Sequence, residues 1–207
     1  MMENRIVLIP KDTTELKLSA LLKKNHFSVV ILFMLLIVAP GVIPKDCYGQ
    51  QFNACELLTR DDAGKTLGAS VSAGVSRNTM MPAGQSCRYT YQMNGSVYGV
   101  TVRITTDSEI KEEGFNDSAA DLMSKQKEAR TGHAYAATTF KEITSLADDA
   151  FWSGTDLWVL KGSVLFIVKS DSYLSGSFKN MNEAKQAAEA QNLQYSLDIA
   201  RVVVARL

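Results

Sequence analysis

Hydrophobic and polar residues follow two different periods along the chain, and these predict helices and strands in turn. Near residue 55, Asn53 with Glu56 and Thr59 with Asp62 form two successive capping-box patterns. This pattern is typical of helix N-termini, because its side chains satisfy backbone N–H groups that lack a partner. We therefore expect a broken first helix that ends at Gly68 and buries the apolar residues Leu57, Leu58, Ala63 and Leu67.

Alternation with period two then predicts a β-hairpin. Residues 86–91 and 98–105 alternate in this way and are joined across Asn94 and Gly95, a favoured hairpin turn. Tyr98, Val100, Val102 and Ile104 share one face of the second strand, and Gly99, Thr101, Arg103 and Thr105 share the other. The first face is therefore expected to be core. A weaker strand candidate precedes the hairpin at residues 71–75.

The second half of the chain repeats the order of helix followed by strands. Ser118 and Asp121 predict a helix that runs to about Arg130 and ends at Gly132. Strands are expected at residues 140–143, 151–152, 157–160 and 164–168, the last two forming a hairpin that turns at residues 161–163. Residues 164–168 are apolar on both faces, which is typical of a central strand.

A long helix closes the chain. Asn180 and Glu183 mark its start, and its apolar positions recur at steps of three and four: Leu193, Leu197, Ala200, Val204 and Leu207. The element order predicts an α+β fold with an antiparallel sheet in two similar halves, helices packed on one face, and this C-terminal helix as the main cover. A parallel α/β sheet is the alternative.

The N-terminal region predicts export. Residues 27–39 are uncharged and nearly all apolar, and they are preceded directly by Lys23, Lys24, Asn25 and His26. Such a run fits the hydrophobic region of a signal peptide, and it is shorter than the roughly 20 residues of a membrane span. We expect cleavage near Gly49, with residues 1–49 as basic region and signal peptide and residues 50–207 as a single periplasmic, secreted or cell-envelope domain. An uncleaved anchor over residues 27–43 is the alternative, and it would be the domain's only contact with a membrane.

Cleavage near residue 49 would remove Cys47 and leave Cys55 and Cys87 in a compartment where thiols are commonly oxidised. A bridge between them would close a loop of about 33 residues and stabilise the fold by roughly 3–4 kcal/mol. Two buried free thiols are the alternative. A metal site is not expected, because residues 50–207 hold one histidine, His133, and no C-x-x-C pair, in which two residues separate the cysteines.

Composition adds little to this picture. The chain of 207 residues is 46% hydrophobic and 21% charged, which excludes a disordered or collagen-like protein. Residues 50–207 carry 16 basic and 18 acidic side chains. In this part of the sequence, basic residues are scattered among acidic ones. Examples of these basic residues are Arg88, Arg103, Lys125, Lys127 and Arg130. We therefore expect no basic face and no nucleic-acid partner.

No sequence motif for a reaction is present. The chain contains no nucleotide-binding glycine loop, zinc-protease, serine-hydrolase or haem-attachment motif, so no cofactor is expected. Asp148 and Asp149 could serve acid–base catalysis with Asp156 or Glu142, which is the basis of an alternative interpretation as a small exported hydrolase. Capping of a turn is the ordinary use of such residues. His133 follows a helix end, where a cap or surface role is expected.

The aromatic residues are the best candidates for a binding surface. Phe151, Trp152, Trp158 and Tyr135 would form an apolar wall if they lay on a sheet face that the helices leave free. Core packing is the alternative for each. The sequence therefore favours an exported binding or interaction module without catalytic activity, whose partner is an unknown small ligand or envelope protein. A structural envelope protein anchored by residues 27–43 is a further alternative.

Several short motifs are spread over residues 54–207. Residues 54–59 (ACELLT), Leu67 with Gly68, and residues 87–89 (CRY) form a C-x-L-L-T, L-G and C-x-Y pattern. This pattern resembles the signature of a family of small exported bacterial domains of unknown function, many of them actinobacterial lipoproteins. Residues 146–152 and the last helix resemble its later pattern. Ala147 stands where the family usually has glycine, and no lipobox is present. The resemblance implies a Cys55–Cys87 disulfide and a compact α+β domain, and it implies no activity.

Overall fold

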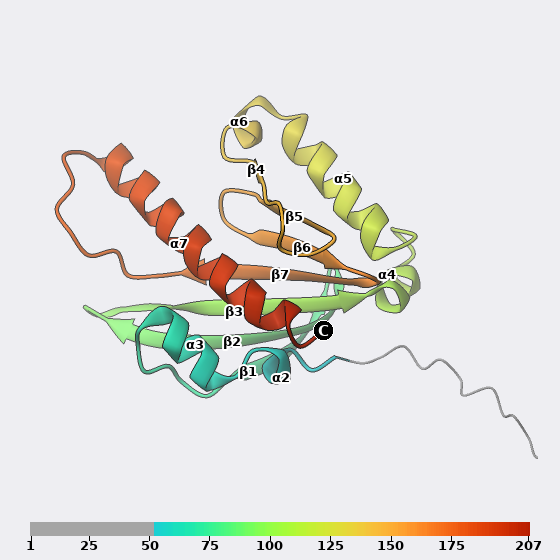
Figure 1. Ribbon diagram of the computed structural model, residues 1–207, viewed down its shortest axis with the longest axis horizontal. Helices are drawn as coiled ribbons and strands as arrows, with labels where there is room; N and C mark the ends of the chain where they lie inside the picture. The colour runs from blue at the N-terminus through green and yellow to red at the C-terminus, as the bar shows by residue number, and fades with distance from the viewer. Residues whose placement is uncertain (1–51) are drawn as a thin grey trace, which may run out of the picture. The chain divides into compact units, whose positions relative to one another are not determined.

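The computed structural model of the protein describes residues 52–207. The expected signal peptide, its cleavage site, Cys47 and the alternative anchor over residues 27–43 lie outside the described residues. Within them, a seven-stranded sheet has the strand order β1-β2-β3-β7-β6-β5-β4, and every neighbouring pair is antiparallel. The predicted α+β fold with an antiparallel sheet is thus confirmed (Figure 1).

The first helices form where the two capping boxes predict them. Helix α2 (Ala54–Leu57) is capped by Asn53, and helix α3 (Arg60–Leu67) by Thr59. Gly68 ends α3 with φ of 63°, in the left-handed region that glycine adopts without strain. The segment then becomes strand β1 (Val75–Met80), so the weak strand expected at residues 71–75 begins where it was predicted to end.

The predicted hairpin consists of β2 (Ala83–Met93) and β3 (Ser96–Thr106), which turn at Asn94 and Gly95. Helix α4 (Asp107–Glu113) follows and was not predicted. A capping box between Thr106 and Glu109 starts this helix, and Thr106 is also the last residue of β3. Helix α5 (Ala119–Thr131) matches the prediction and ends at Gly132.

The second strand group completes the sheet. After the short helix α6 (Ala134–Ala137) come β4 (Lys141–Glu142), β5 (Asp149–Trp152), β6 (Leu157–Lys161) and β7 (Val164–Asp171). Strand β7 pairs with both β3 and β6, which confirms its prediction as a central strand. Helix α7 (Met181–Val204) begins after Asn180, as expected, and runs diagonally across the sheet (Figure 1).

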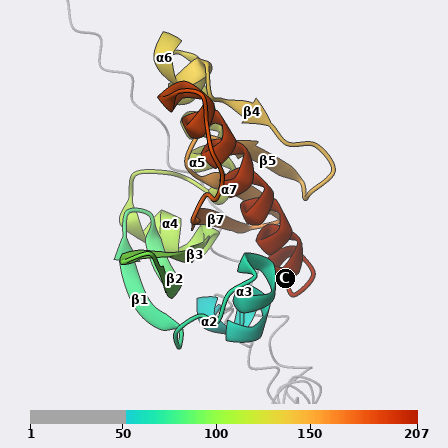
Figure 2. The ribbon, with the colours of Figure 1, turned by 90° about the vertical axis from the view of Figure 1, so that its left-hand side faces the viewer.

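The helices cover both faces of the sheet rather than one. Helices α2, α3 and α7 share one face, where Val102, Phe166 and Ile199 belong to the larger core (Figure 2). Helices α4 and α5 pack on the opposite face through Ile110, Leu122 and Met123, against Phe151, Trp158, Leu165 and Ile167. The expectation of a single helical face is therefore correct for α2, α3 and α7 and wrong for α4 and α5. The thin apolar stripe of α5 is enough for this packing, because α5 covers only part of that face of the sheet.

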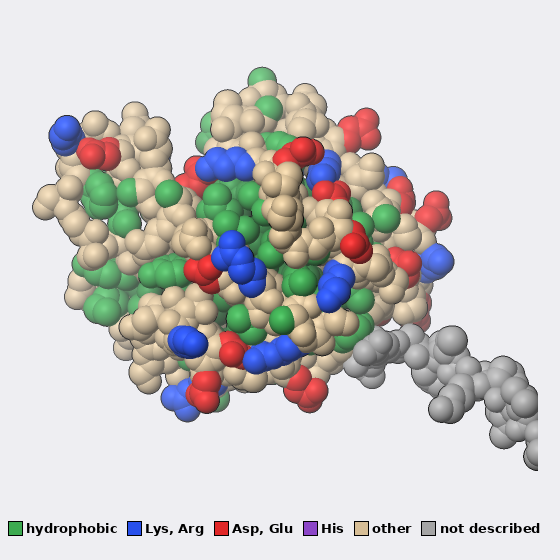
Figure 3. Space-filling view, in the orientation of Figure 1, with side chains coloured by type: hydrophobic (Ala, Val, Ile, Leu, Met, Phe, Trp, Pro, Cys, Tyr) green, Lys and Arg blue, Asp and Glu red, His purple; other side chains and the backbone are tan. Residues whose placement is uncertain are grey.

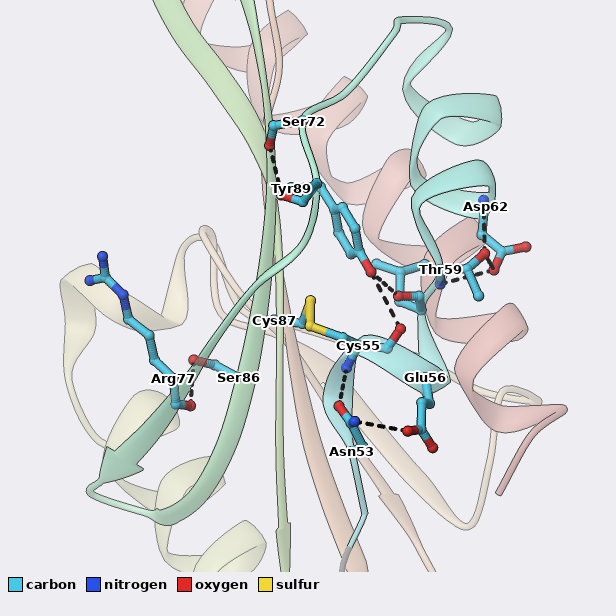
Figure 4. Close-up of a disulfide and its surroundings, with 12 residues drawn as sticks. Asn53, Cys55, Glu56, Thr59, Asp62, Ser72, Arg77, Ser86, Cys87 and Tyr89 are labelled. Atoms are coloured by element: carbon cyan, nitrogen blue, oxygen red, sulfur yellow. Dashed lines mark hydrogen bonds between the residues drawn. A yellow bond between two sulfur atoms is a disulfide. The ribbon is translucent and has the colours of Figure 1, made fainter.

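The Cys55–Cys87 disulfide is present and attaches α2 to strand β2 (Figure 4). Beside it, the Tyr89 hydroxyl donates to the carbonyl oxygen of Leu58 at 2.5 Å and to that of Cys55 at 3.4 Å. Burial raises the pKa of this phenol. The disulfide and Tyr89 therefore fix the first helices on the sheet at adjacent points.

The C-terminus is attached to the same region. Arg206 donates to the Leu57 carbonyl oxygen at 2.8 Å and to the Asp62 carboxylate at 2.7 Å. The hydrogen bond from Arg206 holds the pKa of Asp62 below its ordinary value. In residues 52–207, no helix is both long enough and apolar enough to cross a membrane.

Candidate functional site

One part of the sheet surface is covered by no helix of the described chain. It lies on the α4–α5 side of the sheet, over β1, β2, β3 and the end of β7 distant from α4. We call it the open face and define it by side chains that line two adjoining hollows there: Val75, Arg77, Ser86, Arg88, Thr90, Val97, Thr101, Arg103, Asp156, Trp158, Ile167 and Lys169.

Strand register arranges these side chains in two rows across the strands. One row runs from Val75 through Arg88 and Thr101 to Lys169. The next runs from Arg77 through Ser86, Arg103 and Ile167 to Trp158. Because cations alternate with hydroxyl groups in each row, the four basic side chains form a zigzag in which neighbours occupy diagonal positions, about 7–8 Å apart.

These four cations form no ion pair in the described residues, although one carboxylate, that of Asp156, lines the same hollow as Arg103 and Lys169. Arg77, Arg88 and Lys169 are exposed, and Arg103 is half-buried with one donor on the Met81 carbonyl oxygen at 3.2 Å. None of the four belongs to an ion pair among residues 52–207. Figure 4 shows Arg77 extending away from the disulfide, on the other side of the sheet. Like charges at such short spacing cost free energy unless an anion joins them.

The opposite side of the molecule has a different charge pattern. Figure 3 shows that side, where basic and acidic side chains lie next to one another. Lys141 pairs there with Glu189 at 2.9 Å, and Arg206 pairs with Asp62 at 2.7 Å. The concentration of unpaired positive charge is therefore a property of the open face and does not extend over the whole surface.

Three hollows are joined along this side of the sheet. The first, of about 430 Å³, lies over β1–β3 and includes Arg77 and Arg88. Thr101 also lines the second, of about 380 Å³, which includes Arg103 and Lys169. Arg103 and Trp158 then line a third, of about 350 Å³, beneath the loop between α4 and α5. The three hollows therefore adjoin one another along this side of the sheet, and we call them together the depression.

Trp158 lies at the junction of the second and third hollows. Its side chain is 8% exposed and stacks on Phe151, with ring centroids 5.8 Å apart. Its indole Nε1 is buried and has no hydrogen-bond partner in the described part of the chain. A buried donor without a partner is uncommon and costly.

The other predicted aromatic residues are not brought together with Trp158 on one surface. Trp152 is fully buried on the α7 face, where its Nε1 donates to Glu189 at 3.3 Å. Phe151 is fully buried beneath Trp158 and Phe140. Tyr135 is 89% exposed on α6. Trp152 and Trp158 point to opposite faces because they occupy paired strands at neighbouring rather than directly opposed positions.

The two adjacent carboxylates have structural partners. Asp148 accepts a hydrogen bond from the Gly162 backbone at 2.6 Å and so fixes the β6–β7 turn. Asp149 accepts one from Lys127 at 2.5 Å, which attaches α5 to β5. Neither lines the three joined hollows. Among residues 52–207, no group of three or more histidine, cysteine or acidic side chains is placed to hold a metal ion.

The expectation that the domain has no basic face is wrong. Arg88 and Arg103 are 15 residues apart in the sequence, and Lys169 is much further along, yet strand pairing places all three on one surface with Arg77. The alternation of the hairpin already separated Arg103 from the core positions. The pairing of β3 with β7 carried no comparable sequence signal, so Lys169 was missed.

Comparisons of the chain with protein-family models, curated proteins and solved structures find no match.

Proposed function

We propose that the protein is an exported binding or interaction module of the cell envelope, without catalytic activity, and that it contacts its partner through the open face. The observation that carries this proposal is the group of four unpaired cations lining joined hollows on a surface that no described helix covers. Complementary charge is a common basis of recognition and speeds the encounter of the two partners.

Two further observations support the proposal. The Cys55–Cys87 disulfide is suited to an oxidising compartment, where such bonds persist. The residues with the strongest catalytic pattern in the sequence, Asp148 and Asp149, each hold another element of the fold in place. The rigid sheet beneath the open face is a good scaffold for binding, because it presents side chains at fixed spacing.

The proposal predicts a position-specific contact in living cells. A photoreactive phenylalanine analogue at Thr101, which lines two hollows, should crosslink to a partner when the protein is expressed in its own host. The same analogue at Lys185, exposed on α7, is the matched control. The analogue at position 101 should give adducts outside the cytoplasm. The analogue at position 185 should give none. Equal labelling from the two positions, or none from Thr101, would contradict the proposed use of this face.

A further inference from the structure

We infer that the ligand of the open face is an acidic polysaccharide that lies across the strands from β1 towards β6. This inference rests on the proposed function, and it adds the chemical class of the partner. It is drawn from the spacing of the cations, from the polar groups between them and from the shape of the depression.

The spacing indicates an extended ligand. The four cations lie on four successive strands of the sheet, β1, β2, β3 and β7, so the group spans about 14 Å at the usual strand separation of about 4.8 Å. A single small anion would reach one or two of them. A chain with repeated negative groups would reach all four and relieve the repulsion between neighbours.

The groups between the cations suit a ligand rich in hydroxyls. Ser86, Thr90 and Thr101 lie among the basic side chains, and Asn116 and Gln126 line the third hollow beyond Trp158. The backbone groups of β2, β3 and β7 are already paired within the sheet. Recognition here must therefore use side chains, whose hydroxyl and amide groups both donate and accept hydrogen bonds, as sugar hydroxyls do.

A peptide partner fits less well. An extended peptide usually joins a sheet by pairing with the backbone of an edge strand. Here three of the four cations are on the inner strands β2, β3 and β7, and they project from the face of the sheet. An acidic peptide added at the edge would lie beside β1 and would leave Arg103 and Lys169 uncovered.

A membrane surface and a nucleic acid also fit less well. A surface that docks on anionic lipid presents protruding apolar side chains among cations. On the open face, the exposed apolar residues beside Arg77 and Arg88 are Val75 and Val97, and both line a hollow instead of protruding. Met81 and Phe115 are more exposed, but they line the third hollow, where Arg103 is the one cation of the lining. Single-stranded nucleic acid needs exposed aromatic rings for its bases. Among the residues that line the three hollows, the aromatic ones are Trp158, which is 8% exposed, and Phe115, which is 73% exposed, so a single exposed ring is offered to successive bases.

The test is a binding panel on the exported protein. The probes are polygalacturonate, neutral dextran of similar length, poly-L-glutamate, phosphatidylglycerol vesicles and oligo-dT. We expect polygalacturonate to bind most tightly, more weakly as salt rises, and dextran not to bind. Combined Arg88→Gln and Arg103→Gln substitutions should weaken binding by about tenfold or more. Combined Lys65→Gln and Lys185→Gln substitutions remove the same charge from exposed positions on α3 and α7, and they should leave binding unchanged.

The other outcomes separate this inference from the proposed function. Tighter binding of the peptide, vesicles or oligonucleotide, lost in the double arginine variant, would overturn the polysaccharide and leave the binding face intact. Polygalacturonate binding that both double variants weaken equally would show attraction by overall charge and would also overturn the inference. Failure of every probe would overturn it as well, while crosslinking from Thr101 would still decide whether the face is used.

Discussion

Removal of the Cys55–Cys87 disulfide is expected to lower the free energy of unfolding by about 3–4 kcal/mol. The bond joins residues 32 apart in the sequence, so its loss frees a long loop in the unfolded chain. It also removes a fixed point for α2 on the sheet, beside the Tyr89 hydrogen bonds. Guanidinium unfolding of the oxidised protein and of a combined Cys55→Ala and Cys87→Ala variant measures the difference.

A reductant provides the control for this experiment. Reductant should destabilise the oxidised protein by a similar amount and should leave the double alanine variant unchanged. A difference of less than about 1 kcal/mol between the oxidised protein and the variant would mean that the remaining contacts of α2 hold it in place. The disulfide would then have no substantial part in the stability of the domain.

Trp152→Ala is expected to cost about 3–5 kcal/mol, the range for loss of a large buried aromatic side chain. Trp152 is fully buried between the sheet and α7, and its Nε1 donates to Glu189. Tyr135→Ala, at a side chain that is 89% exposed, should change the free energy of unfolding by no more than about 0.5 kcal/mol. Denaturant unfolding of the two variants compares them directly.

The pair is informative because the sequence placed both residues in one candidate binding surface. A large loss for Trp152→Ala with no loss for Tyr135→Ala would agree with one core residue and one surface residue. Similar, small effects at both positions would contradict the burial of Trp152 and the packing of α7 over it.

Local signals in the sequence predicted most of the helices and strands. Capping pairs such as Thr59 with Asp62 act over one turn, and the turn at Asn94 and Gly95 joins adjacent strands, so both can be read from short segments. Helix α4 was missed because its cap at Thr106 is also the last residue of a strand. The covering of both faces was missed because a helix stripe does not say which side of a sheet it meets.

The candidate site was less predictable than the fold. Trp158 was identified as a binding residue from its residue type, and the structure places it beside the depression. In the sequence, the basic residues that dominate the open face stand far apart and among carboxylates. Their grouping depends on the register of β1 with β2 and of β3 with β7, which joins segments far apart in the sequence. Such long-range pairing has no local signature.

The most direct test of the open face uses the two tryptophan indole N–H signals in a ¹H–¹⁵N spectrum, since the chain has two tryptophans. Trp158 lines the depression, and Trp152 is buried under α7 and is the internal control. Titration with oligogalacturonate should shift the Trp158 signal together with the amides of Arg88, Thr101 and Arg103, and should leave the Trp152 signal in place. Shifts confined to α7, or equal shifts of both indole signals, would contradict binding at the open face.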